Sequence, residues 1–284
     1  MKSNTTFFRD RKILIVTKHE KEKVIAPLLK KELSMRCFTS EKFDTDSLGT
    51  FSGEIPRKND PLTTLRQKCQ LAMELEGFEL AIATEGSFGN HPSIFFAPAN
   101  DELILLYDKK NNIEVIERVL SLNTNFNEAL IETRLQLEDF LKKAQFPSHG
   151  VIIKDTKDNP KTIIKGIDNW TDLERHYTNF ADENRSFYIE TDMRAMYNPT
   201  RMTVIEEACL KLIKKAQTVC PSCDFPGFGI VRAEEGLPCD WCSSKTRSTL
   251  AFVYECKGCN YVERDYFPHG KRTEDPMYCD FCNP

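Results

Sequence analysis

The chain has 284 residues, of which 40% are hydrophobic, so it is long enough for two domains and is not a fibrous, disordered or collagen-like protein. Its 39 basic and 43 acidic residues give a net charge of −4, which argues against a strongly basic nucleic-acid binder. No apolar run reaches the roughly 18–20 residues of a membrane span, and residues 1–12 lack the apolar stretch of a signal peptide. We therefore expect a soluble, cytoplasmic protein without a membrane partner.

The N-terminal part alternates strand-like and helix-like segments, which is typical of an α/β domain. The apolar run 13–17 predicts a strand buried on both faces, and apolar residues at helical spacing after Val24 predict a helix. Asp60 as N-cap, Pro61 at the first helical position and Gly77 as the C-terminal stop predict the next helix.

Further along, the sequence predicts an antiparallel meander of strands at 80–83, 93–97, 102–107 and 113–120. It then predicts a long amphipathic helix at 125–143, strands at 151–154, 162–167 and 187–190, a short helix from Thr171, and a last helix that begins at Asn198-Pro199. The fold class we expect is α/β: a three-layer mixed sheet with an antiparallel meander in residues 1–217, followed by a small double zinc-ribbon domain in residues 218–284.

Cysteine is the strongest compositional signal, because eight of the 11 cysteines form four CxxC motifs: Cys220/Cys223, Cys239/Cys242, Cys256/Cys259 and Cys279/Cys282. Both thiolates of such a motif reach one tetrahedral ion, so eight thiolates predict two structural zinc ions. Disulfides or redox-active pairs are the alternative, which a reducing compartment disfavours. Joining consecutive motifs leaves loops of only 15 and 19 residues, and interleaved pairing stays open. The remaining cysteines are expected in the core: Cys37, Cys69 and Cys209.

The first candidate site follows the predicted strand, where Thr17, His19 and Lys23 precede or begin a helix. In open α/β sheets, ligands bind beyond the carboxyl ends of strands, and a helix N-terminus offers free N–H groups and a positive dipole to phosphate. These three side chains are therefore candidate substrate-binding residues for an anion. A solvated, charged first helical turn is the alternative.

A second candidate site lies in residues 44–57, a loop rich in glycine, serine, threonine and acidic residues. Carboxylates are the hard oxygen ligands that magnesium prefers, and an arginine binds phosphate in a fixed geometry. Glu54 is therefore a candidate catalytic residue, and Arg57 a candidate substrate-binding residue. An ordinary acidic turn is the alternative.

A third candidate site is the glycine-containing stretch 85–92, which follows an apolar strand and is predicted as a loop. Glu85 is placed to hold a metal ion or act as a general base, and His91 lies in the same stretch. On the preceding helix, Thr64 and Lys68 share one face and are expected to reach the same pocket. The alternative is a glycine-rich turn with a capping glutamate.

A fourth candidate site joins the end of the strand at 187–190 to the start of the last helix, with Arg194 and Arg201 beside two carboxylates. This composition suits phosphate and metal, and structural ion pairs are the alternative.

Four stretches, KHEKEKVIAPLL, DTDSLGTFSGEIPR, EGSFGNHPSIFF and TDMRAMYNPTRM, resemble a family of bacterial proteins known only as a domain of unknown function, often with a cysteine-rich tail. This resemblance implies no activity.

Over residues 12 to about 120, the order of the pieces is more remotely similar to the inosine triphosphate pyrophosphatase-like superfamily. The matching positions are Thr17 and Lys23, Thr64 and Lys68, and Glu85-Gly86-Ser87. The chain departs from the superfamily pattern at His19, where an asparagine is usual, in the spacing of its first lysine, and at Ser87, where a glycine is usual. The resemblance implies magnesium-dependent hydrolysis of a nucleoside triphosphate to the monophosphate and pyrophosphate. It places Glu85 and Glu54 on the metal and Lys23 and Arg57 on the phosphates.

The tail, residues 220–284, has seven basic and ten acidic residues, so it carries a charge of −3 before any metal binds. This charge makes nucleic acid a less favourable partner than protein. The alternative function is therefore a non-catalytic protein whose α/β domain binds a nucleotide or another phosphate-bearing ligand while its zinc ribbons dock a partner. Turnover distinguishes the two functions, because only the hydrolase requires it.

Overall fold

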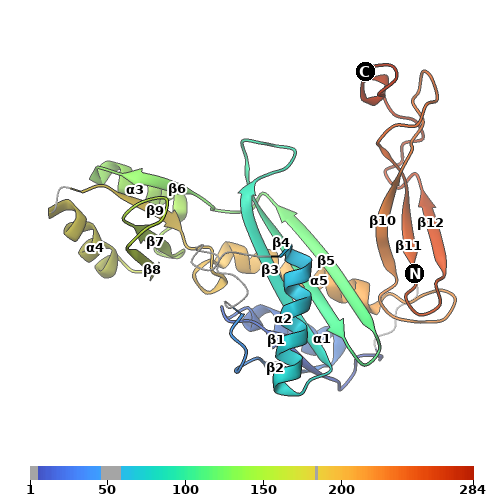
Figure 1. The fold of residues 1–284 in the computed structure, drawn as a ribbon, viewed down its shortest axis with the longest axis horizontal. Helices are drawn as coiled ribbons and strands as arrows, with labels where there is room; N and C mark the ends of the chain where they lie inside the picture. The colour runs from blue at the N-terminus through green and yellow to red at the C-terminus, as the bar shows by residue number, and fades with distance from the viewer. Residues whose placement is uncertain (1–5, 46–58, 183–184) are drawn as a thin grey trace. The chain divides into compact units, whose positions relative to one another are not determined.

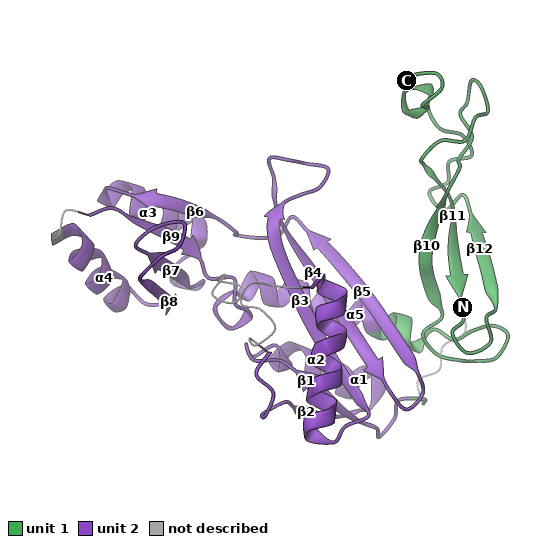
Figure 2. Ribbon diagram, in the orientation of Figure 1, with its two compact units in different colours: residues 1–7, 213–284 green, residues 8–212 purple. Residues whose placement is uncertain are grey.

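The computed structural model describes residues 6–45, 59–182 and 185–284. The chain divides into two compact units, which Figure 2 distinguishes by colour. One unit is Phe8–Leu212, and the other is Ile213–Pro284 with the described end of the N-terminal segment. Within the described ranges, every helix is too short or too polar to cross a membrane.

The larger unit contains a five-stranded mixed sheet with the order β2-β1-β3-β4-β5 (Figure 1). Its strands are β1 (Lys12–Val16), β2 (Arg36–Thr39), β3 (Leu80–Asn90), β4 (Pro98–Asp108) and β5 (Ile113–Ser121). β1 pairs in parallel with both β2 and β3, whereas β3, β4 and β5 pair antiparallel. The predicted mixed sheet with an antiparallel meander is thus confirmed.

Helices cover both faces of this sheet: α2 (Pro61–Glu76) lies on one face, and α1 (Glu22–Leu33) and α5 (Pro199–Gln217) lie on the other (Figure 1). Alternate strand residues explain the two layers, since side chains along a strand point to opposite faces. Leu14, Ala81 and Leu105 pack against Leu65 and Met73 of α2. Their neighbours along the strands face the other helices and are at most 1% exposed: Ile13, Ile15, Ile82, Ile104 and Leu106.

Local signals fix the ends of α2, as predicted from the sequence. The Asp60 carboxylate accepts hydrogen bonds from the backbone N–H groups of Leu62 and Thr63, both at 3.0 Å. Gly77 ends the helix with a φ of +75°, in the left-handed region that glycine adopts without steric cost.

A second, four-stranded antiparallel sheet in the same unit has the order β6-β9-β7-β8. Its strands are β6 (Glu128–Ile131), β7 (Val151–Lys154), β8 (Ile163–Ile167) and β9 (Phe187–Thr191), and its helices are α3 (Arg134–Ala144) and α4 (Trp170–Asp182). These elements share a separate hydrophobic core that includes Ile131, Leu137, Phe140, Leu173 and Phe187. A short 3₁₀ helix, η2 (Ala195–Tyr197), then leads into α5.

The long helix predicted over residues 125–143 is wrong in its first half. Residues 128–131 form β6, which pairs with β9, a strand almost 60 residues further along the chain. The helix begins only after Thr133, whose hydroxyl accepts from the Gln136 N–H at 3.3 Å while the Gln136 side chain accepts from the Thr133 N–H at 3.0 Å. This reciprocal capping box sets the helix start that hydrophobic periodicity placed too early.

The loop predicted at residues 85–92 is also wrong, because β3 continues to Asn90 and pairs with β4 along its whole length. Glu85 lies opposite Leu103, and Gly86 lies opposite Glu102. The strand predicted at 93–97 is instead the turn that joins β3 to β4. Both glycines of this stretch, Gly86 and Gly89, therefore lie in a strand and not in a loop.

The smaller unit is built on a three-stranded antiparallel sheet with the order β10-β11-β12. The strands are β10 (Gly229–Glu235), β11 (Thr249–Glu255) and β12 (Val262–Tyr266), and a 3₁₀ helix, η3 (Pro276–Tyr278), follows. One small cluster of buried residues joins Phe228 to two cysteines, Cys220 and Cys256. An apolar core of this size stabilises a unit only weakly, so the cysteines become the main candidates for holding it together.

Candidate functional site

All four CxxC motifs adopt the same local turn. In each, the backbone N–H four residues after the first cysteine donates to the carbonyl of that cysteine, over 2.8–3.0 Å: Asp224 to Cys220, Ser243 to Cys239, Asn260 to Cys256 and Asn283 to Cys279. In three of the motifs the donor residue has a φ between +56° and +60°: Asp224, Ser243 and Asn260. Aspartate and asparagine tolerate this left-handed conformation better than most residues.

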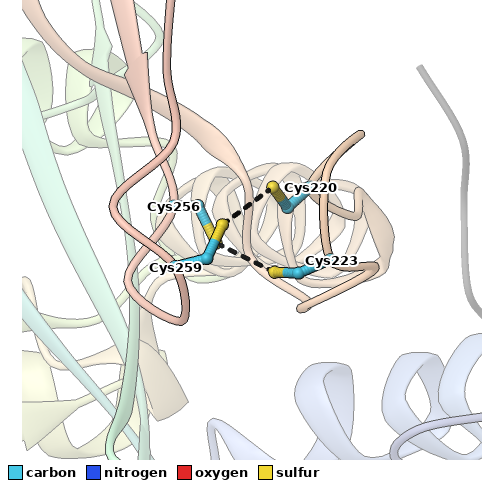
Figure 3. Close-up of side chains that lie close together, drawn as sticks. All are labelled: Cys220, Cys223, Cys256 and Cys259. Carbon is cyan, nitrogen blue, oxygen red and sulfur yellow. Dashed lines mark hydrogen bonds between the residues drawn. The ribbon is translucent and has the colours of Figure 1, made fainter.

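The first and third motifs come together in one tetrad, Cys220, Cys223, Cys256 and Cys259 (Figure 3). The Sγ atoms of Cys220 and Cys259 are 3.8 Å apart, and those of Cys223 and Cys256 are 3.6 Å apart. Sulfurs bound at about 2.3 Å around a tetrahedral zinc ion stand about 3.8 Å from one another. A disulfide needs about 2.05 Å, so this spacing is that of a metal site.

The second and fourth motifs form an equivalent tetrad, Cys239, Cys242, Cys279 and Cys282. The Sγ distances are 3.9 Å between Cys239 and Cys282 and 3.6 Å between Cys242 and Cys279. In both tetrads all four sulfurs lie within 4.8 Å of one another. Each tetrad can therefore hold one metal ion, as the motif spacing predicted.

The pairing of the motifs is interleaved, and the shorter loops of consecutive pairing are not used. The sheet explains why. Residues before β10, after β11 and before β12 meet at one end of an antiparallel sheet, and there lies the first tetrad. The segments between β10 and β11 and after β12 meet at the other end, where the second tetrad forms. Seven residues of β11 separate the two ends, which corresponds to about 23 Å.

Hydrogen bonds to sulfur favour the thiolate form that binds metals. The Ser244 side chain and then the Ser244 backbone N–H lower the pKa of Cys242 to about 6. The backbone N–H of Tyr261 lowers the pKa of Cys259 to about 7. In the same tetrads, burial raises the pKa of Cys256, and the neighbouring Cys242 side chain raises that of Cys282 to about 12. Burial also raises the pKa of Cys69, which packs in the core under α2 as expected. Cys209 is also buried, whereas Cys37 is only partly buried.

The larger unit holds a separate cluster of buried charged side chains where β1 ends. β1 pairs with β3 only as far as Val16 and Ala83, so from Thr84 onward β3 pairs with β4 alone. The chain leaves β1 toward β2 on one side and returns to β3 on the other side. In open sheets a ligand crevice lies at such a reversal, beyond the carboxyl ends of the strands.

Lys21, the residue before α1, and Arg201 of α5 both contact Glu102 of β4 here. Lys21 Nζ donates to the Thr84 hydroxyl at 2.6 Å and lies 3.9 Å from the Glu102 carboxylate. Arg201 contacts the same carboxylate through Nε at 3.2 Å and through its NH2 group at 3.3 Å. Its NH1 group donates to the Met193 carbonyl at 2.6 Å. Glu102 is 0% exposed and Arg201 5% exposed, so this ion pair is removed from water.

Lys68 of α2 forms a second buried ion pair of 2.5 Å with Glu85 of β3, on the α2 face of the sheet and thus opposite to Thr84 and Glu102. Burial, then the positive charge of Arg201, lowers the pKa of Lys21 to about 7, and Glu102 acts in the opposite direction. The cluster thus gathers three basic groups around two carboxylates. We call these five residues the buried charge cluster: Lys21, Lys68, Glu85, Glu102 and Arg201.

Three residues predicted as site residues belong to this cluster: Lys68, Glu85 and Arg201. Thr17 is buried directly after β1 and borders the cluster, and His19 lies half-buried in the turn before α1. The predicted Lys23 is at the surface, where its side chain is 64% exposed and pairs with Glu20.

The other predicted site residues lie elsewhere. His91 is in the turn after β3, where its Nδ1 accepts from the N–H groups of Ser93 and Ile94. Arg194 pairs with Asp192 at 2.6 Å, and its guanidinium stacks 4.7 Å from the centre of the Tyr197 ring. Glu54 and Arg57 lie outside the described residues.

The sequence analysis missed Lys21 and Glu102. Lys21 comes directly before α1, and the sequence analysis chose Lys23, at the start of the same helix, instead. Glu102 stands in an apolar strand among Leu103, Ile104 and Leu105, and a carboxylate that interrupts such a run is the signal that could have revealed it.

A pocket of about 420 Å³ shares Thr17 with this region and lies at the carboxyl ends of β1 and β2. Lys18 and Asp44 form an ion pair of 3.0 Å at its wall. Its lining has two lysines and four carboxylates: Lys18, Lys42, Glu20, Glu22, Glu41 and Asp44. This excess of negative charge disfavours phosphate there and leaves the β1–β3 side as the place for an anion.

Comparison with known families gives one match. Residues 68–284, more than half of the chain, match a family model described as "Domain of unknown function (DUF6671)". No curated protein matches the chain.

Proposed function

The chain belongs to this family of unknown function, and we propose that it is a zinc protein whose larger unit binds a phosphate-bearing ligand at the buried charge cluster. The cysteine tetrads support the first part, and the cluster supports the second. Each part has its own test, because metal binding and ligand binding concern different units.

Zinc fits the tetrads because four thiolates in tetrahedral spacing are its preferred structural ligands, without an open position for catalysis. The role of the metal is then to hold the three-stranded sheet together at both ends. Elemental analysis of protein purified without added metal should find two zinc ions per chain. A content of iron or of no metal would contradict this assignment.

The phosphate proposal rests on one observation: Lys21 and Arg201 are buried beside the single carboxylate of Glu102, while Lys68 is already paired with Glu85. Buried basic groups without a full set of counter-charges are costly unless one is neutral or an anion joins them. Lys21, with its lowered pKa, is the group that gains most from an added anion.

Isothermal titration with inorganic tripolyphosphate tests this proposal on the zinc-loaded full chain. Lys21→Met should weaken binding at least tenfold, because it removes the buried cation that contacts Thr84 beside the end of β1. Lys23→Met is the matched control, since that lysine lies two residues away at the surface. Equal affinities of both variants and the wild type would place the anion elsewhere, and no binding to the wild type would reject the proposal.

A second candidate function is magnesium-dependent hydrolysis of a nucleoside triphosphate to the monophosphate and pyrophosphate. The observation that favours it is Glu85, a buried carboxylate held by Lys68 beside the proposed anion site. A carboxylate in that position is suited to hold a metal ion or to activate water.

Pyrophosphate release from a panel of ordinary and deaminated nucleoside triphosphates tests the enzyme. Glu85→Gln should abolish release without changing the zinc content, whereas Glu79→Gln, at an exposed position just before β3, should not. If no nucleotide of the panel releases pyrophosphate, the non-catalytic function is favoured, in which the tail docks a partner. Two exposed aromatic residues of the second tetrad, Trp241 and Phe281, support a protein partner there.

A further inference from the structure

The pocket of about 420 Å³ lies where β1 and β2 end. The two strands pair in parallel, with Ile15 opposite Thr39, so the chain leaves the sheet from both strands at the same edge. Residues 17–22 and 39–44 follow these strand ends and form the described wall of the pocket. Pockets that hold small organic molecules have volumes of about 300–1,000 Å³, so this one has the size for such a ligand.

One side chain of the wall lacks a hydrogen-bond partner. Within the described ranges, the buried side chains with unpartnered polar atoms are Thr17, through Oγ1, and Asn100 of β4, through its amide. Thr17 belongs to the pocket wall and is 8% exposed. Buried polar groups are nearly always paired, and an unpaired one marks a place where a water, an ion or a ligand belongs. A hydroxyl both donates and accepts, so its neighbours decide the charge of that ligand.

The charge of the wall favours a cation. Its residues include four carboxylates and two lysines, which gives a formal charge of −2. The carboxylates of Glu20 and Asp44 each pair with a lysine, at 2.5 and 3.0 Å. Glu22 and Glu41 have no ion-pair partner among the residues that the structure describes. These two carboxylates are therefore free to meet positive groups of a ligand.

The spacing of the carboxylates favours an organic cation over a metal ion. In the described part of the chain, the groups of three or more ligand atoms within 4.8 Å of one another are the two cysteine tetrads. The carboxylates of the pocket thus do not converge on one point, and separate ammonium groups suit them better. Phe43 lines the same wall and packs against the core under α2. Its ring offers apolar surface to a hydrocarbon chain and an aromatic face to an ammonium group.

We infer that this pocket binds a small organic dication, a linear diamine. Its ammonium groups pair with Glu22 and Glu41, and the Thr17 hydroxyl accepts a hydrogen bond from one of them. An ammonium group has three donors, so it serves a carboxylate and a hydroxyl together. The inference is independent of the proposed phosphate binding, which concerns Lys21 and Thr84 on the β3 side of β1.

Isothermal titration of the zinc-loaded full chain compares butylamine with linear diamines of four, six and eight carbons, at about 0.15 M salt to screen exposed charges. At least one diamine should bind at least tenfold more tightly than butylamine. Glu22→Gln and Glu41→Gln should each weaken its binding about fivefold. Lys42→Met should strengthen binding, because it removes a positive charge from the wall. Glu74→Gln, at an exposed carboxylate of α2 outside the pocket, is the matched control and should change nothing.

Thr17→Val tests the hydroxyl. Valine keeps the shape of the side chain and removes the unpartnered group, so the variant should melt no lower than the wild type and bind the diamine several-fold more weakly. If this variant does not fold, Thr17→Ala repeats the test with a smaller side chain.

Three results would overturn the inference. The first is diamines that bind no tighter than butylamine. The second is an affinity that both glutamate variants leave unchanged. The third is displacement of the diamine by an equal concentration of magnesium chloride, which would show a metal site instead.

Discussion

Lys21 Nζ lies 2.6 Å from the Thr84 hydroxyl oxygen, at the place where β1 has ended and β3 continues. The lysine thus occupies the room that the next residues of β1 would fill. The basic and acidic groups around it come from four other elements: Arg201 of α5, Lys68 of α2, Glu85 of β3 and Glu102 of β4. The contact joins the start of α1 to the sheet. It also makes the pKa of the Lys21 side chain depend on folding, because the groups that shift it come from several elements.

Stability should depend on pH through Lys21. Its pKa is about 7 in the folded protein against 10.5 for a free side chain, so between these values the unfolded chain binds more protons. Stability therefore rises with pH across this window and is lowest once pH falls below 7. Lys21→Met removes this contribution, so its stability advantage over the wild type should shrink as pH rises from 7 to 9. Urea denaturation at several pH values measures the free energies of unfolding of the variant and the wild type. A difference between them that is constant with pH would show that Lys21 stays charged throughout.

Breaking the pair of Arg201 with Glu102 should be costly. Among the described residues, Arg201→Met leaves the 0% exposed Glu102 carboxylate with Lys21, at 3.9 Å, as its one basic partner, so we expect a loss of about 3 kcal/mol in the free energy of unfolding. The control is Arg118→Met, which breaks an exposed pair with Asp101 and should cost at most about 1 kcal/mol. Chemical denaturation of both variants gives the comparison. Similar small losses in both would mean that water reaches Glu102.

Gly86→Ala should disturb the ion pair of Arg201 with Glu102, because both side chains pack directly on Gly86. A Cβ atom at Gly86 would collide with the Arg201 guanidinium and the Glu102 carboxylate, whereas one at Gly89 would meet nothing within 4 Å. Overpacking of this kind costs about 1–3 kcal/mol. Gly86→Ala should therefore lower the melting temperature by several degrees, and Gly89→Ala on the same strand should change it little. An equal effect of the two substitutions would point to strand propensity instead of the collision.

Double substitutions should reveal the interleaved metal pairing. Cys220→Ser and Cys256→Ser affect one tetrad, so the double variant should lose one ion, as each single variant does. Cys220→Ser with Cys239→Ser affects both tetrads and should lose both ions. Metal-to-protein ratios by elemental analysis decide between the pairings. If the second double variant kept one ion, consecutive motifs would share a metal.

The parts of the fold that local signals specify could be predicted from the sequence. Asp60, Pro61 and Gly77 set the bounds of α2, and the CxxC spacing identified all eight cysteine ligands. The interleaved pairing could not be predicted, because the order of the strands in the sheet decides which motifs meet. β6 was missed for a similar reason, since its partner β9 is distant in sequence and its own residues suit a helix as well.

The choice between Lys21 and Lys23 shows how sensitive a site residue is to its position at a helix start. Successive helical residues turn by about 100°, so two residues move a side chain by about 200°, to the opposite side of the helix. Lys21 therefore meets Thr84 and Glu102, while Lys23 reaches only Glu20. The unpartnered amide of Asn100 was likewise invisible in the sequence, because pairing across β3 and β4 places it.

The interleaved tetrads also impose an order on how the tail matures during synthesis. The first centre stays incomplete until Cys259 has left the ribosome, and the second until Cys282 has followed. A nascent chain that carries only the first two CxxC motifs offers four thiolates that belong to two different centres. The first centre can thus be completed before β12 is translated, whereas the second is completed only after all three strands, and a chain that stops before Cys256 has no complete centre at all.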